Sequence, residues 1–356
     1  MFLLGAGASS EAGAPLVKDF LTTASALQAK RQPASDFECF QRVLDAIDAL
    51  QAVHPKTQMD LDNLEEVFGA FEMANMIGVF PGHAPEQIPE LLLSFKRLLI
   101  DTLERTTVFR YSNGKVLPPE SYDRFAKLVN ALNAKTSTTR CSIITFNYDL
   151  ALDWALHFNG VGFDYCLSEA AGPSLASKVP YLKMHGSLNW ASASETKEII
   201  PWLVSDYVST RNWLLFDDGS EVALRMGSQL ASDPPTHLCN GTLEPVPVIV
   251  PPAWNKTVYH ERIARVWTRA ARELSDAKNV VVSGYSLFGT DIYFKYLFAL
   301  GSVGRSRIRR FWVYDPDATV GKRFEDLVSP GVGFRYEPWR FSGMVNTLLA
   351  NLRGGG

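Results

Sequence analysis

The stretch that decides the expected fold is Met1-Phe-Leu-Leu-Gly5-Ala6-Gly7-Ala-Ser9. Its first four residues form an apolar, β-like run, which breaks at the glycines and continues into a helix start that carries Pro15. A strand that passes through a glycine turn into a helix is typical of a nucleotide-binding α/β unit, because the turn's N–H groups and the helix dipole can hold a pyrophosphate. The same pattern also occurs as a purely structural turn, so other parts of the chain have to support it.

The glycine turn departs from the fingerprint of NAD-dependent dehydrogenases. Ser10 stands where that fingerprint has its third glycine, and no second strand ending in Asp or Glu follows about 20 residues on. The sequence therefore disfavours an ordinary hydride-transfer enzyme.

Four more short runs read as strands, and the first of them, apolar and rich in β-branched residues, has the pattern of a strand buried on both faces. They cover residues 141–146, 180–184, 279–283 and 310–314. Helical patterns alternate with them, one at about 260–276 and another that ends near Leu300. Strands alternating with helices predict a Rossmann-like, doubly wound parallel sheet of the α/β class.

Two segments interrupt this pattern. Residues 31–139 are mostly helical, with apolar side chains at helical spacing, and predict a helical insertion. Residues 187–256 are rich in Pro, Asp, Ser and Trp, and predict a small irregular module that covers the sheet. The remaining parts, residues 1–30 and 140–353, form the expected nucleotide-binding domain.

Polar side chains follow two of the expected strands. Asn147 and Asp149 come directly after the strand 141–146, and His185 follows the strand 180–184. Ligands of α/β sheets bind at the carboxyl edge, so these side chains should share a crevice with the glycine turn. An amide can donate to and accept from a ribose hydroxyl or a water, and imidazole is suited to proton transfer near neutral pH. The alternative for Asp149 is a helix cap.

Two later turns follow strands in the same way. Ser283-Gly284-Tyr-Ser286-Leu-Phe-Gly289-Thr-Asp291 does not fit the G-x-S-x-G nucleophile elbow, because Phe288 intervenes, and its alternative is a tight turn with an Asp cap. Asp315 and Asp317 follow the strand 310–314 and could meet the adenosine ribose, although a turn stopped by Pro316 explains them as well.

Composition limits the remaining function classes. The 356 residues carry a formal net charge of -3, which gives no long-range field for nucleic acid. The four cysteines form no C-x-x-C pair, so we expect no metal site and no zinc ribbon. Neither a signal peptide nor an apolar run of 18 residues is found, and we expect a cytoplasmic protein with free thiols.

The order of five motifs resembles the SIR2-like proteins of bacterial anti-phage defence. These motifs are GAGAS…AGAP, TFNYD, KMHGSLNW, VPPAWNK and SGYSLFGTD, within residues 1–30 and 140–320. The helical stretch around Asn63-Leu-Glu65-Glu66-Val67 is similar to the insertion that such proteins carry. The resemblance implies a sirtuin-like fold and a site for NAD⁺, which is the substrate, without a metal.

The candidate cofactor-binding residues follow the strands, and they are Gly5, Ala6, Gly7, Ser9, Pro15, Asp149, Gly284, Ser286, Asp291 and Asp315. The resemblance implies that the GAGAS turn lines the pyrophosphate and that Gly284 and Ser286 complete the pocket. It also implies that Asn147 and Asp149 flank the nicotinamide ribose, with His185 as the catalytic base.

The resemblance implies NAD⁺ hydrolysis more than deacylation. Sirtuin deacetylases carry two cysteine pairs for zinc and read GIPDFR where this chain has Gly13-Ala-Pro15-Leu-Val-Lys18. The expected function is an NAD⁺ glycohydrolase that depletes NAD⁺ in abortive infection, controlled by homo-oligomer assembly or by a sensor partner, with no membrane or nucleic-acid contact. Two alternatives stay open: a deacylase or ADP-ribosyltransferase, and a non-catalytic module that senses NAD⁺ or ADP-ribose.

Overall fold

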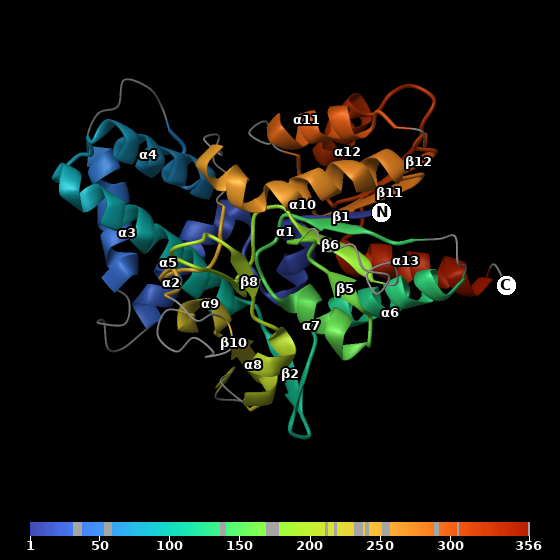
Figure 1. Cartoon of the computed structure of the whole chain (residues 1–356), viewed down its shortest axis with the longest axis horizontal. Coiled ribbons are helices and arrows are strands. Elements are labelled where there is room, and N and C mark those ends of the chain that lie inside the picture. Colours follow the sequence, from blue (N-terminus) through green and yellow to red (C-terminus); the bar gives the residue numbers. More distant parts are fainter. Residues whose placement is uncertain are drawn as a thin grey trace.

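A central parallel sheet lies between two layers of helices, with a helical bundle at one end (Figure 1). The structure is a computed structural model that describes residues 1–30, 38–52, 59–135, 140–168, 178–210, 213–216, 219–230, 238, 242–250, 257–287, 292–304 and 306–354. The expected α/β class with a doubly wound parallel sheet is confirmed.

The central sheet has seven parallel strands in the order β13-β12-β11-β1-β4-β6-β5. Five of them match the expected runs: β1 (Phe2–Leu4), β4 (Ile143–Thr145), β6 (Val179–Lys183), β11 (Asn279–Ser283) and β12 (Arg310–Tyr314). The edge strands β5 (Phe163–Asp164) and β13 (Gly333–Glu337) complete the sheet. Strand order reverses between β1 and β11, which is where ligands bind in sheets of this kind.

Helices cover both faces of the sheet (Figure 1). One layer contains α10 (Thr257–Asp276), α11 (Ile292–Gly301) and α12 (Ala318–Leu327), and the other contains α6 (Glu120–Lys135), α7 (Ala151–Phe158) and α13 (Phe341–Gly354). Phe2 of β1 contacts Phe125 of α6 edge to face, whereas Phe311 of β12 packs against Phe324 of α12. None of the described helices is both long and apolar enough to cross a membrane.

The predicted insertion, residues 31–139, contributes to three parts of the molecule. Its helices α3 (Glu38–Ala52), α4 (Leu64–Ile77) and α5 (Ile88–Thr106) pack with α2 (Phe20–Lys30) into the bundle. A hairpin follows, formed by β2 (Phe109–Ser112) and β3 (Lys115–Leu117). Its last helix, α6, packs against α7 and α13 in the helical layer of the main sheet.

The segment expected to be irregular, residues 187–256, contains regular structure in its described parts. It includes β7 (Trp190–Ser192), β8 (Ile199–Pro201), α8 (Val204–Thr210), β9 (Trp213–Leu215), β10 (Glu221–Leu224) and α9 (Met226–Gln229). Strands of three or four residues are too short to show a periodic pattern in the sequence. A small antiparallel sheet in the order β3-β2-β10-β9 joins this segment to the hairpin.

The first helix is shorter than expected. α1 (Ala6–Ser9) continues only into a 3₁₀ turn at Ser10–Ala12, which ends at Gly13 with φ of 95°. A Cβ on Gly13 would lie 2.1 Å from the carbonyl oxygen of Thr106, so this position requires glycine. The expectation that the helix carries Pro15 is therefore wrong. Pro15 lies in the loop beyond Gly13, next to the bundle.

Candidate active site

Two glycine turns cross at the carboxyl edge of the sheet, one after β1 and one after β11. The N–H of Gly7 donates to the carbonyl of Gly284 at 2.8 Å, and the N–H of Gly5 donates to the carbonyl of Ser283 at 3.2 Å. A Cβ on Gly7 would lie 2.7 Å from Cα of Gly284, and one on Gly284, where φ is 65°, would lie 2.4 Å from the nitrogen of Ala8. These glycines are therefore required by contact between the two backbones, a reason that the sequence pattern did not show.

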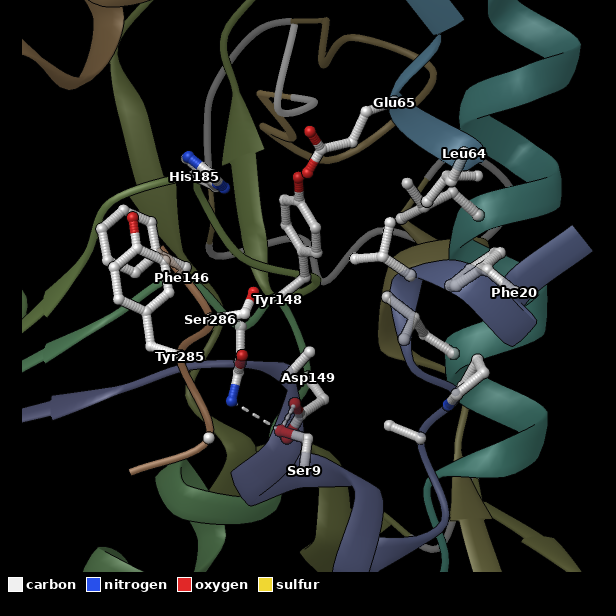
Figure 2. Close-up of a pocket in the computed structure, with 18 residues that line it drawn as sticks. Ser9, Phe20, Leu64, Glu65, Phe146, Tyr148, Asp149, His185, Tyr285 and Ser286 are labelled. Atoms are coloured by element: carbon white, nitrogen blue, oxygen red, sulfur yellow. Dashed lines mark hydrogen bonds between the residues drawn. The ribbon is translucent and has the colours of Figure 1, made fainter. Parts of the chain in front are cut away.

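A cleft opens above this glycine crossing. One side, which we name the polar half, is formed by residues after the strands: Ala6, Ser9, Phe146, Asn147, Tyr148, Asp149, His185, Gly284, Tyr285 and Ser286. The other side, the apolar half, comes from the loop after α1 and from the helical bundle: Ala14, Pro15, Val17, Phe20, Leu64, Glu65, Leu99 and Leu103. Figure 2 shows the two halves facing each other across Tyr148.

Asn147 is held by its amide nitrogen. Nδ2 donates to the carbonyl of Gly5 at 2.8 Å and to Oγ of Ser9 at 2.7 Å. The backbone N–H of Asn147 donates to Oγ1 of Thr145 at 3.1 Å. Because both amide protons are used within the protein, Oδ1 is the atom with which Asn147 can contact a ligand, and it can only accept.

Asp149 supports this arrangement from below. Its carboxylate accepts hydrogen bonds from the hydroxyl of Ser9 and from the N–H of Ala151, the latter at 3.0 Å. Oγ of Ser9 also lies 3.0 Å from the hydroxyl of Tyr122. Asp149 is only 4% exposed, and burial raises its pKa, although nearby Lys183 opposes the effect. The contact with Ala151 lies at the start of α7, beside Leu150, which is the N-cap residue of that helix. The expected contact of Asp149 with the cofactor stays a prediction.

His185 is 4% exposed and lies among aromatic rings in the polar half. Its ring centre is 5.0 Å from that of Phe146, in an edge-to-face contact, and 6.0 Å from that of Tyr148. The next residue, Gly186, has φ of 86°, and a Cβ there would lie 2.0 Å from the carbonyl oxygen of Val248. The carbonyl of His185 accepts from the N–H of Val250 at 2.8 Å, so the segment around Val250 fixes the backbone of His185.

Three residues that the sequence did not indicate help to form the cleft. Tyr285 stacks on Phe146 with ring centres 4.3 Å apart and builds the wall beside His185. The hydroxyl of Tyr148 donates to the carbonyl of Val250 at 2.9 Å. Glu65, in the first turn of α4, directs its carboxylate toward that hydroxyl (Figure 2). The sequence explains Glu65 only as a complement to the helix dipole, because the position of α4 over the sheet edge is a tertiary property.

Most of the candidate residues come together in the cleft, and a few do not. Ala6, Ser9, Pro15, Gly284 and Ser286 line it, together with Asn147, Asp149 and His185. Gly5 and Gly7 lie in the crossing beneath it.

Asp315, in contrast, is not among the lining residues. Its side chain accepts from the N–H of Asp317 at 2.9 Å, and burial raises its pKa. Asp291 lies outside the described residues, so its expected part in cofactor binding stays a prediction.

The described part of the chain contains no group of three or more His, Cys, Asp or Glu side chains arranged to hold a metal ion. Cys39, Cys141 and Cys166 are free thiols, and Cys239 lies outside the described residues.

Comparisons with known proteins give likeness in structure only. No protein-family model matches the sequence, and no curated protein matches it. A solved Sir2 homologue in complex with NAD aligns over 100% of this chain and 89% of that chain, with a TM-score of 0.41 and 14% identity. A mutant Sir2 homologue in complex with ADP-ribose aligns with a TM-score of 0.42 and 14% identity, over 100% of this chain and 92% of that chain. Sir2 with a p53 peptide and NAD⁺ aligns with a TM-score of 0.40 and 14% identity, over 99% of this chain and 92% of that chain.

Proposed function

We propose that the cleft binds NAD⁺ and hydrolyses its nicotinamide–ribose bond to give nicotinamide and ADP-ribose. One observation carries the proposal. Asn147 and His185, which follow two different strands, line a single cleft with Ala6 and Ser9 of the glycine turn. An amide oxygen, an imidazole and a glycine turn at the carboxyl edge of a parallel sheet are the groups that this reaction needs.

The reaction makes modest demands on a protein. Nicotinamide in NAD⁺ is already a cationic leaving group, so no acid has to protonate it. The ribose has to be held while positive charge develops at C1′, and a water has to be positioned for attack. Positioning is therefore expected to supply most of the rate enhancement.

Asn147 is assigned to orient the attacking water or a ribose hydroxyl. Its Nδ2 is fixed by Gly5 and Ser9, at 2.8 and 2.7 Å, so its Oδ1 is presented as a fixed acceptor. An acceptor at this point aligns an O–H bond and increases the electron density on the oxygen that attacks.

His185 is assigned as the base that takes a proton through a ribose hydroxyl. Imidazole can accept a proton near neutral pH, and the aromatic rings of Phe146, Tyr148 and Tyr285 line this end of the cleft. The apolar half suits the flat nicotinamide ring, because Val17, Phe20 and the leucines of the bundle offer it apolar surface.

The biological role extends this proposal. From the motif order, which resembles SIR2-like defence proteins, we infer an effector that depletes NAD⁺ when a partner or self-assembly activates it. A deacylase or ADP-ribosyltransferase would release nicotinamide only when an acceptor is added. A sensor would bind NAD⁺ and release none.

The test is to incubate the purified protein with NAD⁺ and to measure free nicotinamide, ADP-ribose and bound NAD⁺. Asn147→Ala and His185→Ala should each reduce turnover by at least ~100-fold with little effect on unfolding. His83→Ala and Asn346→Ala, which change the same residue types away from the cleft, should behave as wild type. Equal turnover in wild type and both site variants would refute the assignment, and absence of both binding and release in wild type would refute the function.

A further inference from the structure

A buried ammonium group lies beneath the polar half of the cleft. Lys183 is the last residue of β6, and its side chain is 0% exposed. Its Nζ donates to the carbonyl of Asp149 at 2.7 Å, to Oδ2 of Asp153 at 3.0 Å and, at 3.4 Å, to the carbonyl of Tyr148. The side chain of Asp153 is also 0% exposed, so both charges are fully removed from water.

Further hydrogen bonds satisfy the partner carboxylate. Asp153 accepts from the hydroxyl of Tyr181 at 3.0 Å and from that of Tyr165. The chain of contacts continues from Tyr165 to Nδ2 of Asn189 at 3.1 Å. The charges are thus well paired, but an apolar pair of similar size often gives equal stability at such a position. Stability alone therefore does not account for an ionic pair at this place.

The position of Lys183 suggests what the pair does. Lys183 precedes His185 by two residues, and its ammonium contacts the carbonyls of the two residues that follow Asn147. The same two turns are joined by the N–H of Met184, which donates to the carbonyl of Thr145 at 2.8 Å. The carbonyl of Tyr148 also accepts from the N–H of Leu188 at 3.1 Å and from the hydroxyl of Ser187 at 3.4 Å, so the segment after β6 contacts it as well. The ammonium adds a contact to the carbonyl of Asp149, one residue further along the turn, at 2.7 Å.

We propose that Lys183 is a positioning residue that fixes the Asn147 turn relative to His185. The inference rests on the proposed function, because it assigns the pair a role in that reaction. Without the ammonium, the carbonyl of Asp149 loses its charged donor, and the turn that carries Oδ1 of Asn147 is held less firmly on the side of β6. A displacement of about 1 Å in a catalytic group can reduce turnover by about 100-fold.

The kinetic test separates turnover from binding. Lys183→Met fills a similar volume without the charge, and we expect kcat to fall by about 100-fold while KM changes by less than about threefold. Tyr165→Phe is the matched control, because it removes one bond to Asp153 and leaves the contacts of Lys183 in place, so kcat should stay within about threefold of wild type. Wild-type kcat in Lys183→Met, or an equal loss in Tyr165→Phe, would overturn the proposal.

A second measurement does not depend on activity. In protein labelled with ¹⁵N-asparagine, the side-chain amide of Asn147 should be protected from exchange, because Nδ2 donates to Gly5 and Ser9. Lys183→Met should lose this protection at least tenfold, and Tyr165→Phe should retain it. Unchanged protection in Lys183→Met contradicts the inference even if the wild type hydrolyses NAD⁺, and lost protection supports the positioning role even if it does not.

Asp153→Asn replaces Lys183→Met in both measurements if the latter does not fold. Its amide oxygen can still accept from the ammonium, but the buried charge of Lys183 is left unpaired, which weakens the hold of the ammonium on the backbone of the Asn147 turn. We expect a loss of kcat and of amide protection that exceeds the loss in Tyr165→Phe. An effect no larger than that of Tyr165→Phe would count against the positioning role.

Discussion

The two halves of the cleft are built by different means. In the polar half, Ser9, Asn147 and Asp149 are joined by hydrogen bonds to one another and to the backbone after two neighbouring strands, β1 and β4. In the apolar half, helices and a loop contribute apolar side chains such as Val17 and Leu103. These side chains define the shape of the wall and make no directional hydrogen bonds. The difference indicates that the sheet edge sets the chemistry, while the bundle sets which ligand fits and how tightly.

The largest expected effect concerns a buried carboxyl group that lies behind the apolar half. Glu104 follows Leu103, is 1% exposed, and accepts from the N–H groups of Gly227 and Ser228. Burial raises its pKa from 4.5 to about 8. The folded state thus keeps a proton that the unfolded state releases, so stability is highest below about pH 4.5 and falls as the pH rises toward 8.

Glu104→Gln should remove this loss, which is on the order of 4 kcal/mol across the window. Urea unfolding at pH 5, 6.5 and 8 measures it. If the free energy of unfolding changed with pH in the same way in variant and wild type, Glu104 would not be the source of the pH-dependent loss of stability.

Gly284→Ala should follow in size, because it attacks the crossing on which the polar half rests. The added Cβ meets Gly7 and Ala8 at 2.7 Å or less in a left-handed backbone conformation, and we expect a loss of about 3 kcal/mol in the free energy of unfolding. Gly78→Ala is the control, since its φ is 69° but nothing lies within 4 Å of the new Cβ, and it should cost about 1 kcal/mol. Equal losses would mean that strain, and not the backbone contact, explains Gly284.

Ser9→Ala should separate the halves kinetically. It removes the acceptor of one Asn147 amide proton and the donor to Asp149, so kcat should fall by about 30-fold with little change in KM. Ser10→Ala, whose hydroxyl donates to the carbonyl of Gly7 at 2.9 Å outside the cleft, should keep most of the activity. A rise in KM at constant kcat would reverse the roles we give to the two halves.

Val17→Ala should give the smallest effect and the opposite signature. The substitution removes two carbons from the apolar wall, so part of the contact between this wall and the ligand is lost. KM for NAD⁺ should therefore rise about fivefold at unchanged kcat. Val79→Ala, at a position 67% exposed and outside the cleft lining, should leave both constants as in wild type. A reduced kcat in Val17→Ala would show that the apolar half also positions the reacting groups.

The polar half was largely predictable because its residues follow strands. An apolar, β-branched run predicted β4 and a short, mostly apolar run predicted β6, and the rule that ligands lie at carboxyl ends then selected Asn147 and His185. The partner Tyr122 was not predictable, because it lies on α6, within a segment interpreted as an insertion. Lys183 stood in an expected strand, but its charge partner Asp153 reaches it only through the packing of α7 on the sheet.

The apolar half could not be derived in the same way. Leu64, Leu99 and Leu103 have the spacing of buried helix residues, and spacing does not tell whether a side chain packs on another helix or borders a cavity. The edge strand β13 was missed for a related reason: its residues are half-exposed, so no continuous apolar run marks it.

The crossing of Gly5 and Gly7 with Gly284 carries a consequence for how such a protein can diversify. Because the bottom of the cleft is made of main-chain atoms, exchanging side chains cannot alter it, and it stays constant. New ligand preferences therefore have to arise from substitutions in the sides of the cleft. One of these sides belongs to the bundle, which is a contiguous stretch of chain. Transplanting that stretch between relatives would alter what is accepted while leaving the reaction beneath it the same.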